Sequence, residues 1–276
     1  MIDPLYALTG FVVGALVGMT GVGGGALMTP VLILFFGVPP VTAVGSDLIY
    51  AAITKTGGSL VHGFAHSIDW RVVRLLASGS VPMTVLTLSL LSHAEHSGEA
   101  TPHLITLVLG ATLFVTAVLL VLGEKITKSY RRRVRALDPR HTAIMTVLMG
   151  ALLGILVPLS SIGAGAIGLT VLVMLYPDIP MARLVGSDIA HAVPLTLIAG
   201  IGHWMMGSID WHIIGLLLIG SLPGIVVGSL FAQRIPERAL RLLLAATLFA
   251  VASRMAYEHM GAIGSFFAAF TPPSSH

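Results

Sequence analysis

Two glycine- and serine-rich strings interrupt long apolar stretches of the chain. Residues 18–25 read GMTGVGGG within the stretch 5–36, and residues 158–165 read PLSSIGAG within 142–176. A helix that restarts after such a break presents unpaired N–H groups and the positive end of its dipole, which together bind small anions. Serine hydroxyls add donors for the oxygens of an oxyanion. The candidate anion-binding residues are Gly23, Gly24, Gly25 and Ala26 in the first string, and Ser160, Ser161, Gly163, Ala164 and Gly165 in the second.

The alternative for these strings is close packing of helices, the usual role of small residues in membranes. Their matching positions in the two halves of the chain favour anion binding. Residues 21–26 also fit the dinucleotide-binding pattern G-x-G-x-x-A, but no plausible βαβ unit surrounds them.

Lys55 is the ionisable residue that stands out within an apolar segment, 41–61. A charge at the centre of a membrane costs about 3 kcal/mol or more, so such residues are functional candidates. Lys55 either supplies positive charge to a substrate cavity or is neutralised by Asp47 or Asp188. The equivalent residue in the second half is Thr196, so any role of the lysine belongs to one half.

Five further polar residues are candidates for coupling or gating: Asp47, Asp188, His191, His62 and His203. We place Asp47 and Asp188 in the first turns of their helices, where a carboxylate can cap the N-terminus. The alternative is proton coupling, because Asp188 and His191 are three residues apart on one helix face. His62 and His203 fall near helix ends, where we expect interfacial hydrogen bonding; gating or proton relay is the alternative.

Other polar groups have simpler explanations. Asp69-Trp70 and Asp210-Trp211 read as capped helix starts with interfacial aromatic anchors. Three histidines and two glutamates between 93 and 103 match no metal signature, and we expect them in a loop, 92–102, outside the membrane. The chain has no cysteine, which excludes thiolate catalysis and cysteine-based zinc sites. These observations predict a protein that is not an enzyme and has no metal, cofactor or nucleic-acid partner.

Composition identifies the elements that must position these residues. The chain has 276 residues, of which 55% are hydrophobic and 10% charged, whereas soluble domains carry about 25% charge. A spanning helix needs about 20 apolar residues, and six segments meet this: 41–61, 72–91, 103–122, 182–205, 213–231 and 239–255. The pieces beside each break are shorter, about 12 to 17 residues. We predict an all-α polytopic membrane protein in which each break forms a broken helix or a re-entrant hairpin.

The two halves of the chain repeat one another. Four motifs recur at a constant offset of 141: Gly45-Ser46-Asp47, His62, residues 67–70 (SIDW) and residues 79–82 (GSVP). The pattern at residues 14–18 recurs at 150–154, an offset of 136 that implies about five extra residues near the second break. The predicted organisation is repeat 1 (1–122), a basic linker (123–140), repeat 2 (141–257) and a tail (258–276).

The positions of the basic residues favour inverted repeats. If each repeat crosses the membrane an odd number of times, all but two of the 15 Lys and Arg lie on the cytoplasmic side together with the linker. An even number of crossings leaves Arg183, Arg234, Arg238 and Arg241 outside. Inverted repeats with interrupted helices are typical of secondary transporters that bind substrate near the membrane midplane.

The residues that carry a family resemblance are the Gly-x-Gly-Gly-Gly string followed by Pro30, the sequence AVGSD at 43–47, and SIDWR at 67–71. The arrangement resembles the TauE/SafE family of sulfite exporters, also called the toluene sulfonate uptake permease family, from about residue 9 to 257. The resemblance implies alternating-access transport of sulfite or small organosulfonate anions across the bacterial inner membrane, with protons as a candidate coupling ion. Uptake of another organosulfur or small carboxylate anion, or an anion channel, is the alternative. Many members look like Gly-Thr-Ser where this chain has Gly-Ser-Asp in both halves.

Overall fold

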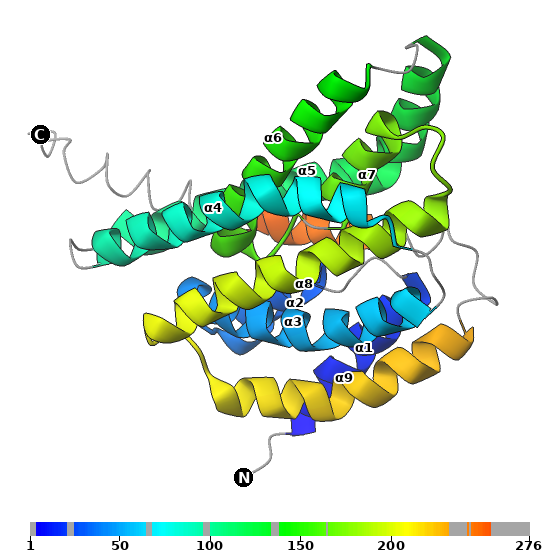
Figure 1. Cartoon of the computed structure of the whole chain (residues 1–276). Coiled ribbons are helices and arrows are strands. Elements are labelled where there is room, and N and C mark those ends of the chain that lie inside the picture. The colour runs from blue at the N-terminus through cyan, green and yellow to red at the C-terminus, as the bar shows by residue number, and fades with distance from the viewer. Residues whose placement is uncertain are drawn as a thin grey trace, which may run out of the picture.

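The computed structural model describes residues 4–20, 25–64, 68–95, 100–133, 138–163, 165–231, 242 and 244–254. The described part of the chain is helical (Figure 1). Its elements are α1 (Pro4–Thr20), α2 (Gly25–Phe36), α3 (Pro40–Phe64), α4 (Trp70–Glu95), α5 (Ala100–Arg133), α6 (Pro139–Ser160), α7 (Ala166–Leu175), α8 (Met181–Met205) and α9 (Trp211–Phe231), followed by an apolar helix at Leu244–Arg254. The prediction of an all-α protein is confirmed.

Among the described residues, five helices are long and apolar enough to cross a membrane. The candidate spans are Trp70–His93, Ile105–Gly123, Pro139–Ser160, Met181–Met205 and Trp211–Gly228. Four of them overlap the predicted segments 72–91, 103–122, 182–205 and 213–231 over most of their length. The predicted segment 41–61 lies within α3, which has 25 residues. Large apolar side chains such as Leu90, Leu148 and Val226 are more than half exposed, as expected for surfaces that face lipid.

The main helix contacts join the first half of the chain to the second. α1 packs along α9, α4 along α6, and α3 along α8 near the centre of the molecule (Figure 1). Glycines permit this proximity: a Cβ at Gly14 would lie 2.5 Å from the carbonyl oxygen of Ser221, and one at Gly154 would lie 2.4 Å from that of Ser80. Both distances are below van der Waals contact, so these helix pairs depend on glycine.

Each of the two interrupted stretches forms a pair of helices, α1–α2 and α6–α7, as predicted. The second break has a distinctive backbone, because Ser161 has φ 57°, Gly163 φ 125° and Gly165 φ 118°. Positive φ favours glycine, so the break is built into the sequence at 163 and 165. The corresponding residues 21–24 of the first string lie outside the described residues.

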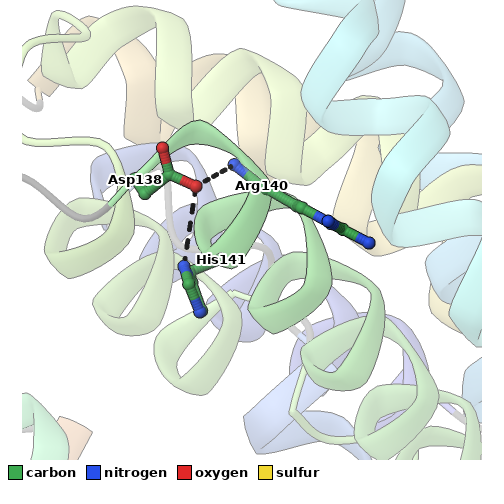
Figure 2. Close-up of polar contacts among 3 residues, drawn as sticks. All are labelled: Asp138, Arg140 and His141. Carbon is green, nitrogen blue, oxygen red and sulfur yellow. Dashed lines mark hydrogen bonds and ion pairs between the residues drawn. The ribbon is translucent and has the colours of Figure 1, made fainter.

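The expected length of the pieces beside the second break is wrong. α6 has 22 residues and is itself a candidate span, whereas α7 has 10. α6 begins earlier than expected because Asp138 caps it: its Oδ2 accepts a hydrogen bond from the backbone N–H of Arg140 at 3.3 Å and lies 3.6 Å from Nδ1 of His141 (Figure 2). It also continues through Pro158 before it ends at Ser160.

The expected loop and linker are both shorter than predicted. α4 continues to Glu95 and α5 begins at Ala100, so helices occupy most of the expected loop at 92–102. α5 has 34 residues and ends at Arg133, which places much of the basic linker 123–140 in a helical extension. Apolar pattern marks only the part of a helix that packs in an apolar environment, and a charged extension carries no such signal. The tail 258–276 lies outside the described residues.

The two Asp-Trp motifs start helices, as predicted. Oδ1 of Asp69 accepts from the N–H groups of Arg71 at 3.0 Å and Val72 at 3.4 Å. Oδ1 of Asp210 accepts from those of His212 at 2.9 Å and Ile213 at 3.1 Å. These contacts satisfy N–H groups that have no partner within the helix.

The same two motifs also join the halves. The hydroxyl of Ser187 accepts from the N–H of Asp69 at 2.7 Å, and that of Ser46 accepts from the N–H of Asp210 at 3.0 Å. Each serine stands directly before Asp188 or Asp47. The residue that precedes α4 in the first half therefore bonds to α8 of the second half, and the residue that precedes α9 bonds to α3.

Candidate functional site

A cluster of buried polar side chains lies where α3 and α8 pack beside the two breaks. It contains Asp47 and Lys55 from α3, and Asp188 and His191 from α8. All four are less than 10% exposed. Asp47 and Asp188 each lie seven residues after the first residue of their helix, Pro40 and Met181. The capping role at their own helix starts is therefore wrong, since both carboxylates lie two turns inside the helix.

Asp47 contacts the N-terminal part of α2. Its Oδ2 accepts hydrogen bonds from the backbone N–H of Thr29 at 3.2 Å and from the Thr29 hydroxyl at 2.5 Å. Its Oδ1 is buried and has no hydrogen-bond partner in the described part of the chain. The Ser161 hydroxyl of the second break lies near the same carboxylate. Asp47 thus connects α3 of one half to the breaks of both halves.

Asp188 has the corresponding position at the N-terminus of α7. The backbone N–H of Gly165 interacts with its carboxylate. The side chain lies directly against the α7 backbone, because a Cβ on Gly168 would be 2.7 Å from Asp188 Oδ1. Within the described residues this Oδ1 has no hydrogen-bond partner, so one carboxylate oxygen is again left without a donor.

Lys55 supplies a positive charge between these groups. Its ammonium interacts electrostatically with Asp188 and with Asp47, and also with His191. Its side chain is 7% exposed, so solvent provides little screening. Lys55 therefore interacts with both of the aspartates that the sequence offered as its partners.

His191 is bonded on one side only. Its Nε2 lies 2.8 Å from the Ser80 hydroxyl on α4, whereas its buried Nδ1 has no partner among the described residues. The equivalent pair at an offset of 141 is Tyr50 and Ser221, which interact through their hydroxyls without a close hydrogen bond.

His203 lies in the last turn of α8, near the end of the helix as expected. The residue is fully buried, and its Nε2 lies 2.9 Å from the carbonyl oxygen of Pro158. Pro158 lacks an N–H and leaves the carbonyl of Gly154 without its helical donor. The Thr87 hydroxyl approaches that carbonyl at 3.4 Å. Side chains of α8 and α4 thereby support the end of α6 beside the break.

The hydroxyls of the two serines in the second break differ in whether they already have hydrogen-bond partners. Ser160 Oγ donates to the carbonyls of Leu156 at 2.8 Å and Ile162 at 3.2 Å, and accepts from the Ile162 N–H. Ser161 Oγ is buried and has no partner in the described residues. Of the two predicted donors, Ser161 is the one that can bind a further group.

The remaining predicted residues are described only in part. Gly25 and Ala26 begin α2, and Gly163 and Gly165 flank the start of α7. Gly23, Gly24 and Ala164 lie outside the described residues, and the structure describes no side chain for His62. Within its described residues it holds no group of three or more metal-binding side chains.

Sequence reasoning missed four residues of the cluster: Thr29, Tyr50, Ser80 and Ser221. The two serines were visible as parts of the repeated GSVP and GSLP motifs, at 79–82 and 220–223. Thr29 and Tyr50 carry no signal of their own, because a single hydroxyl in an apolar helix usually bonds a carbonyl of the same helix.

Comparison with known proteins agrees with this arrangement. A family model described as "Sulfite exporter TauE/SafE" matches residues 6–255. A protein of Bacillus subtilis (strain 168), described as "Probable membrane transporter protein YjnA", is 36% identical over 245 residues, covering 87% of this chain and 94% of its own. A "Probable membrane transporter protein MJ0441" of Methanocaldococcus jannaschii is 26% identical over 260 residues, covering 89% and 92%. No solved structure matches the chain.

The helical spans, the two breaks and the buried charges thus occur in a chain whose sequence matches transporters over nearly its whole length. The family resemblance predicted from the motifs is confirmed, and with it the expectation that the chain is not an enzyme. The protein is a multi-pass membrane protein that belongs to the TauE/SafE family of membrane transporters.

Proposed function

We propose that the protein is a secondary transporter of sulfite or a small organosulfonate anion, acting as an exporter across the bacterial inner membrane by alternating access. The family model that it matches is described as a sulfite exporter, which supports this substrate class. The observation that carries the proposal is that α2 and α7 each contact an aspartate near their N-termini, and that both aspartates interact with the same buried lysine, Lys55.

The anion-binding residues are proposed from this geometry. The N-terminus of α7, with Gly163, Gly165 and the unbonded hydroxyl of Ser161, offers N–H and O–H donors to an oxyanion. Lys55 contributes the positive charge. The equivalent donors in the first half are proposed to come from the sequence string 23–26, of which Gly25 and Ala26 begin α2. In a weakly screened interior these donors bind an anion more strongly than the same groups do in water.

The halves are proposed to be inverted repeats that rock around this site. Two features support equivalence: the reciprocal bonds from Ser46 and Ser187 to the opposite loops, and the matching helix pairs α1–α9 and α6–α4. Inversion also places the basic end of α5 in the cytoplasm.

The glycine contacts suggest a different alignment of the first helices from the one based on residues 14–18. Gly10 and Gly14 face the carbonyls of Leu217 and Ser221, and Gly150 and Gly154 face those of Leu76 and Ser80. These contacts pair residue 14 with residue 154, an offset of 140 instead of 136. The second copy then has one extra residue rather than five.

The coupling residues are proposed to be Asp47, Asp188 and His191, with His203 supporting the second break and His62 at the equivalent position in α3. Protons are the proposed coupling ion. An uptake permease for another organosulfur or small carboxylate anion, or an anion channel, would use the same donors, and the flux experiment separates these functions.

The test is anion flux into proteoliposomes that contain the purified protein, comparing sulfite, a small sulfonate, a small carboxylate, sulfate and chloride, with and without an imposed pH gradient. Saturable sulfite or sulfonate flux that responds to the gradient supports a proton-coupled transporter. Flux that does not saturate would indicate a channel. Preference for the carboxylate, or no flux of any sulfur oxyanion, would overturn the proposed substrate.

A further inference from the structure

Both helix N-termini proposed to hold the substrate already hold a carboxylate of the protein itself. At α2, Asp47 accepts bonds from the N–H and hydroxyl of Thr29. At α7, Asp188 interacts with the Gly165 N–H and lies against Gly168. A carboxylate and a sulfonate are both oxyanions that accept hydrogen bonds from the same donors, so each aspartate occupies a position suited to the substrate.

The two carboxylates are held with unequal strength. Asp47 has two hydrogen bonds, one of them a short bond of 2.5 Å from a hydroxyl. The described residues provide no side-chain donor within hydrogen-bond distance of Asp188, and its Oδ1 has no partner. Because Oδ1 is unpaired in Asp47 as well, the two carboxylates differ in the Thr29 side-chain hydrogen bond, and Asp188, which has no such bond in the described residues, is the one that leaves its position more readily.

We propose that Asp188 is an internal competitor of the transported anion: its carboxylate occupies the anion-binding position at the N-terminus of α7 and vacates it when the substrate binds. This inference rests on the proposed function, because it concerns the same binding position. Asp47 remains bound to α2 during this exchange.

Charge balance links the exchange to a proton. In the described part of the structure, the ionisable side chains around Asp188 are Lys55 and Asp47 on α3 and His191 on α8. The neutral Ser80 comes from α4, and α7 has no ionisable residue. With both aspartates ionised, Lys55 balances only one of them, so an entering anion meets net negative charge. A proton from water that forms an O–H bond on Asp188 removes this repulsion. It returns to water when the anion leaves and the carboxylate binds α7 again.

Anion and proton therefore bind together, and by linkage the anion affinity rises as the pH falls. The slope is at most about tenfold per pH unit for one coupled proton. Methanesulfonate is the suitable probe, because its own charge stays constant between about pH 5 and 8, where the protein is to be titrated.

The experiment measures methanesulfonate binding to the purified full chain by calorimetry across this pH range, for the wild type and for Asp188→Asn. We expect wild-type affinity to fall as the pH rises. The variant should bind at least about tenfold more tightly near neutral pH and lose most of the pH dependence. Asp178→Asn, on an exposed loop before α8, is the matched control and should behave as wild type.

Two results would overturn the inference, and they are distinguishable. If the wild type binds methanesulfonate and Asp188→Asn binds it equally or more weakly, Asp188 is not a competitor, although the proposed function stands. If neither protein binds any sulfur oxyanion, the proposed function fails and the inference fails with it. Should Asp188→Asn not fold, Asp188→Ala, which also removes the carboxylate, is measured in the same way.

Discussion

The two helices that follow the breaks, α2 and α7, each contact an aspartate, but they differ in how they contact it. At the first, Thr29 holds Asp47 with both its N–H and its hydroxyl. At the second, Asp188 lies against Gly168, which has no side chain that could donate a hydrogen bond to the carboxylate. The carboxylate of the first half thus has a side-chain hydrogen bond, whereas that of the second half has none within the described residues.

Two further positions separate the halves. Lys55 corresponds to Thr196 at an offset of 141, and the hydroxyl of Thr196 bonds the carbonyl of Ala192 in its own helix at 2.8 Å. Tyr50 corresponds to His191, which bonds Ser80. The buried lysine therefore comes from the first half of the chain, whereas the buried imidazole comes from the second.

The largest effect should follow from filling the second break. Gly163→Val places a branched side chain at φ 125°, 3.3 Å from Leu153 Cδ2, beside the proposed binding position. We expect sulfite flux in proteoliposomes to be abolished while the protein still inserts and purifies. Gly37→Val is the control, because Gly37 also has positive φ (64°) but has no neighbour within 4 Å. Equal loss of flux in both variants would assign the effect to backbone strain alone.

The next largest effect should follow from removing the positive charge of Lys55, which has no counterpart in the second half. Lys55→Met keeps the length of the side chain but removes the positive charge, so anion binding should weaken by about 10- to 100-fold, as expected for a charged contact worth about 1.5–3 kcal/mol. Calorimetry with methanesulfonate measures this. Lys125→Met, on the exposed surface of α5, should leave the affinity unchanged. An unaltered affinity in Lys55→Met would assign Lys55 to a purely structural role.

A smaller effect is expected when Asp47 loses its side-chain hydrogen bond and so resembles Asp188. Thr29→Val removes the hydroxyl bonded to Asp47 at nearly constant volume. A hydrogen bond to a charged group contributes about 1.5–3 kcal/mol, so the melting temperature in detergent should fall by several degrees. Thr56→Val is the control, because the Thr56 hydroxyl bonds only the carbonyl of Ala52 in its own helix. Equal melting temperatures for the two variants would contradict the firm attachment of Asp47.

The smallest effect compares the two equivalent serines of α4 and α9. Ser80→Ala removes the 2.8 Å bond to His191 and should lower stability by about 1 kcal/mol. Ser221→Ala should be nearly neutral or slightly stabilising, because the Ser221 hydroxyl is buried and has no hydrogen-bond partner in the described residues. Thermal unfolding of both variants in the same detergent measures the difference. A larger loss in Ser221→Ala would reverse the proposed asymmetry.

Some of the site could be predicted because it is encoded locally. The glycines at 163 and 165 mark a break whatever surrounds them, and Lys55 stands out in an apolar helix. The predicted first-turn position of Asp47 and Asp188 was wrong although the helix starts were predicted to within one residue: α3 and α8 begin at Pro40 and Met181, so both carboxylates lie two turns inside the helix. The contact of His203 with Pro158 was not predicted because it depends on the packing of α8 against α6, which sequence pattern does not reveal.

The sequence by itself determined the helical segments, the two breaks, the capped helix starts at Asp69 and Asp210, and the family. These depend on apolar runs, backbone preferences and contacts within a few residues, which the chain carries in order. Only the tertiary structure decided that Asp47 reaches Thr29, that Asp188 lies against Gly168, and that Lys55 stands between them. Such contacts join separate helices, and side-chain partners across helices are set by packing rather than by local sequence.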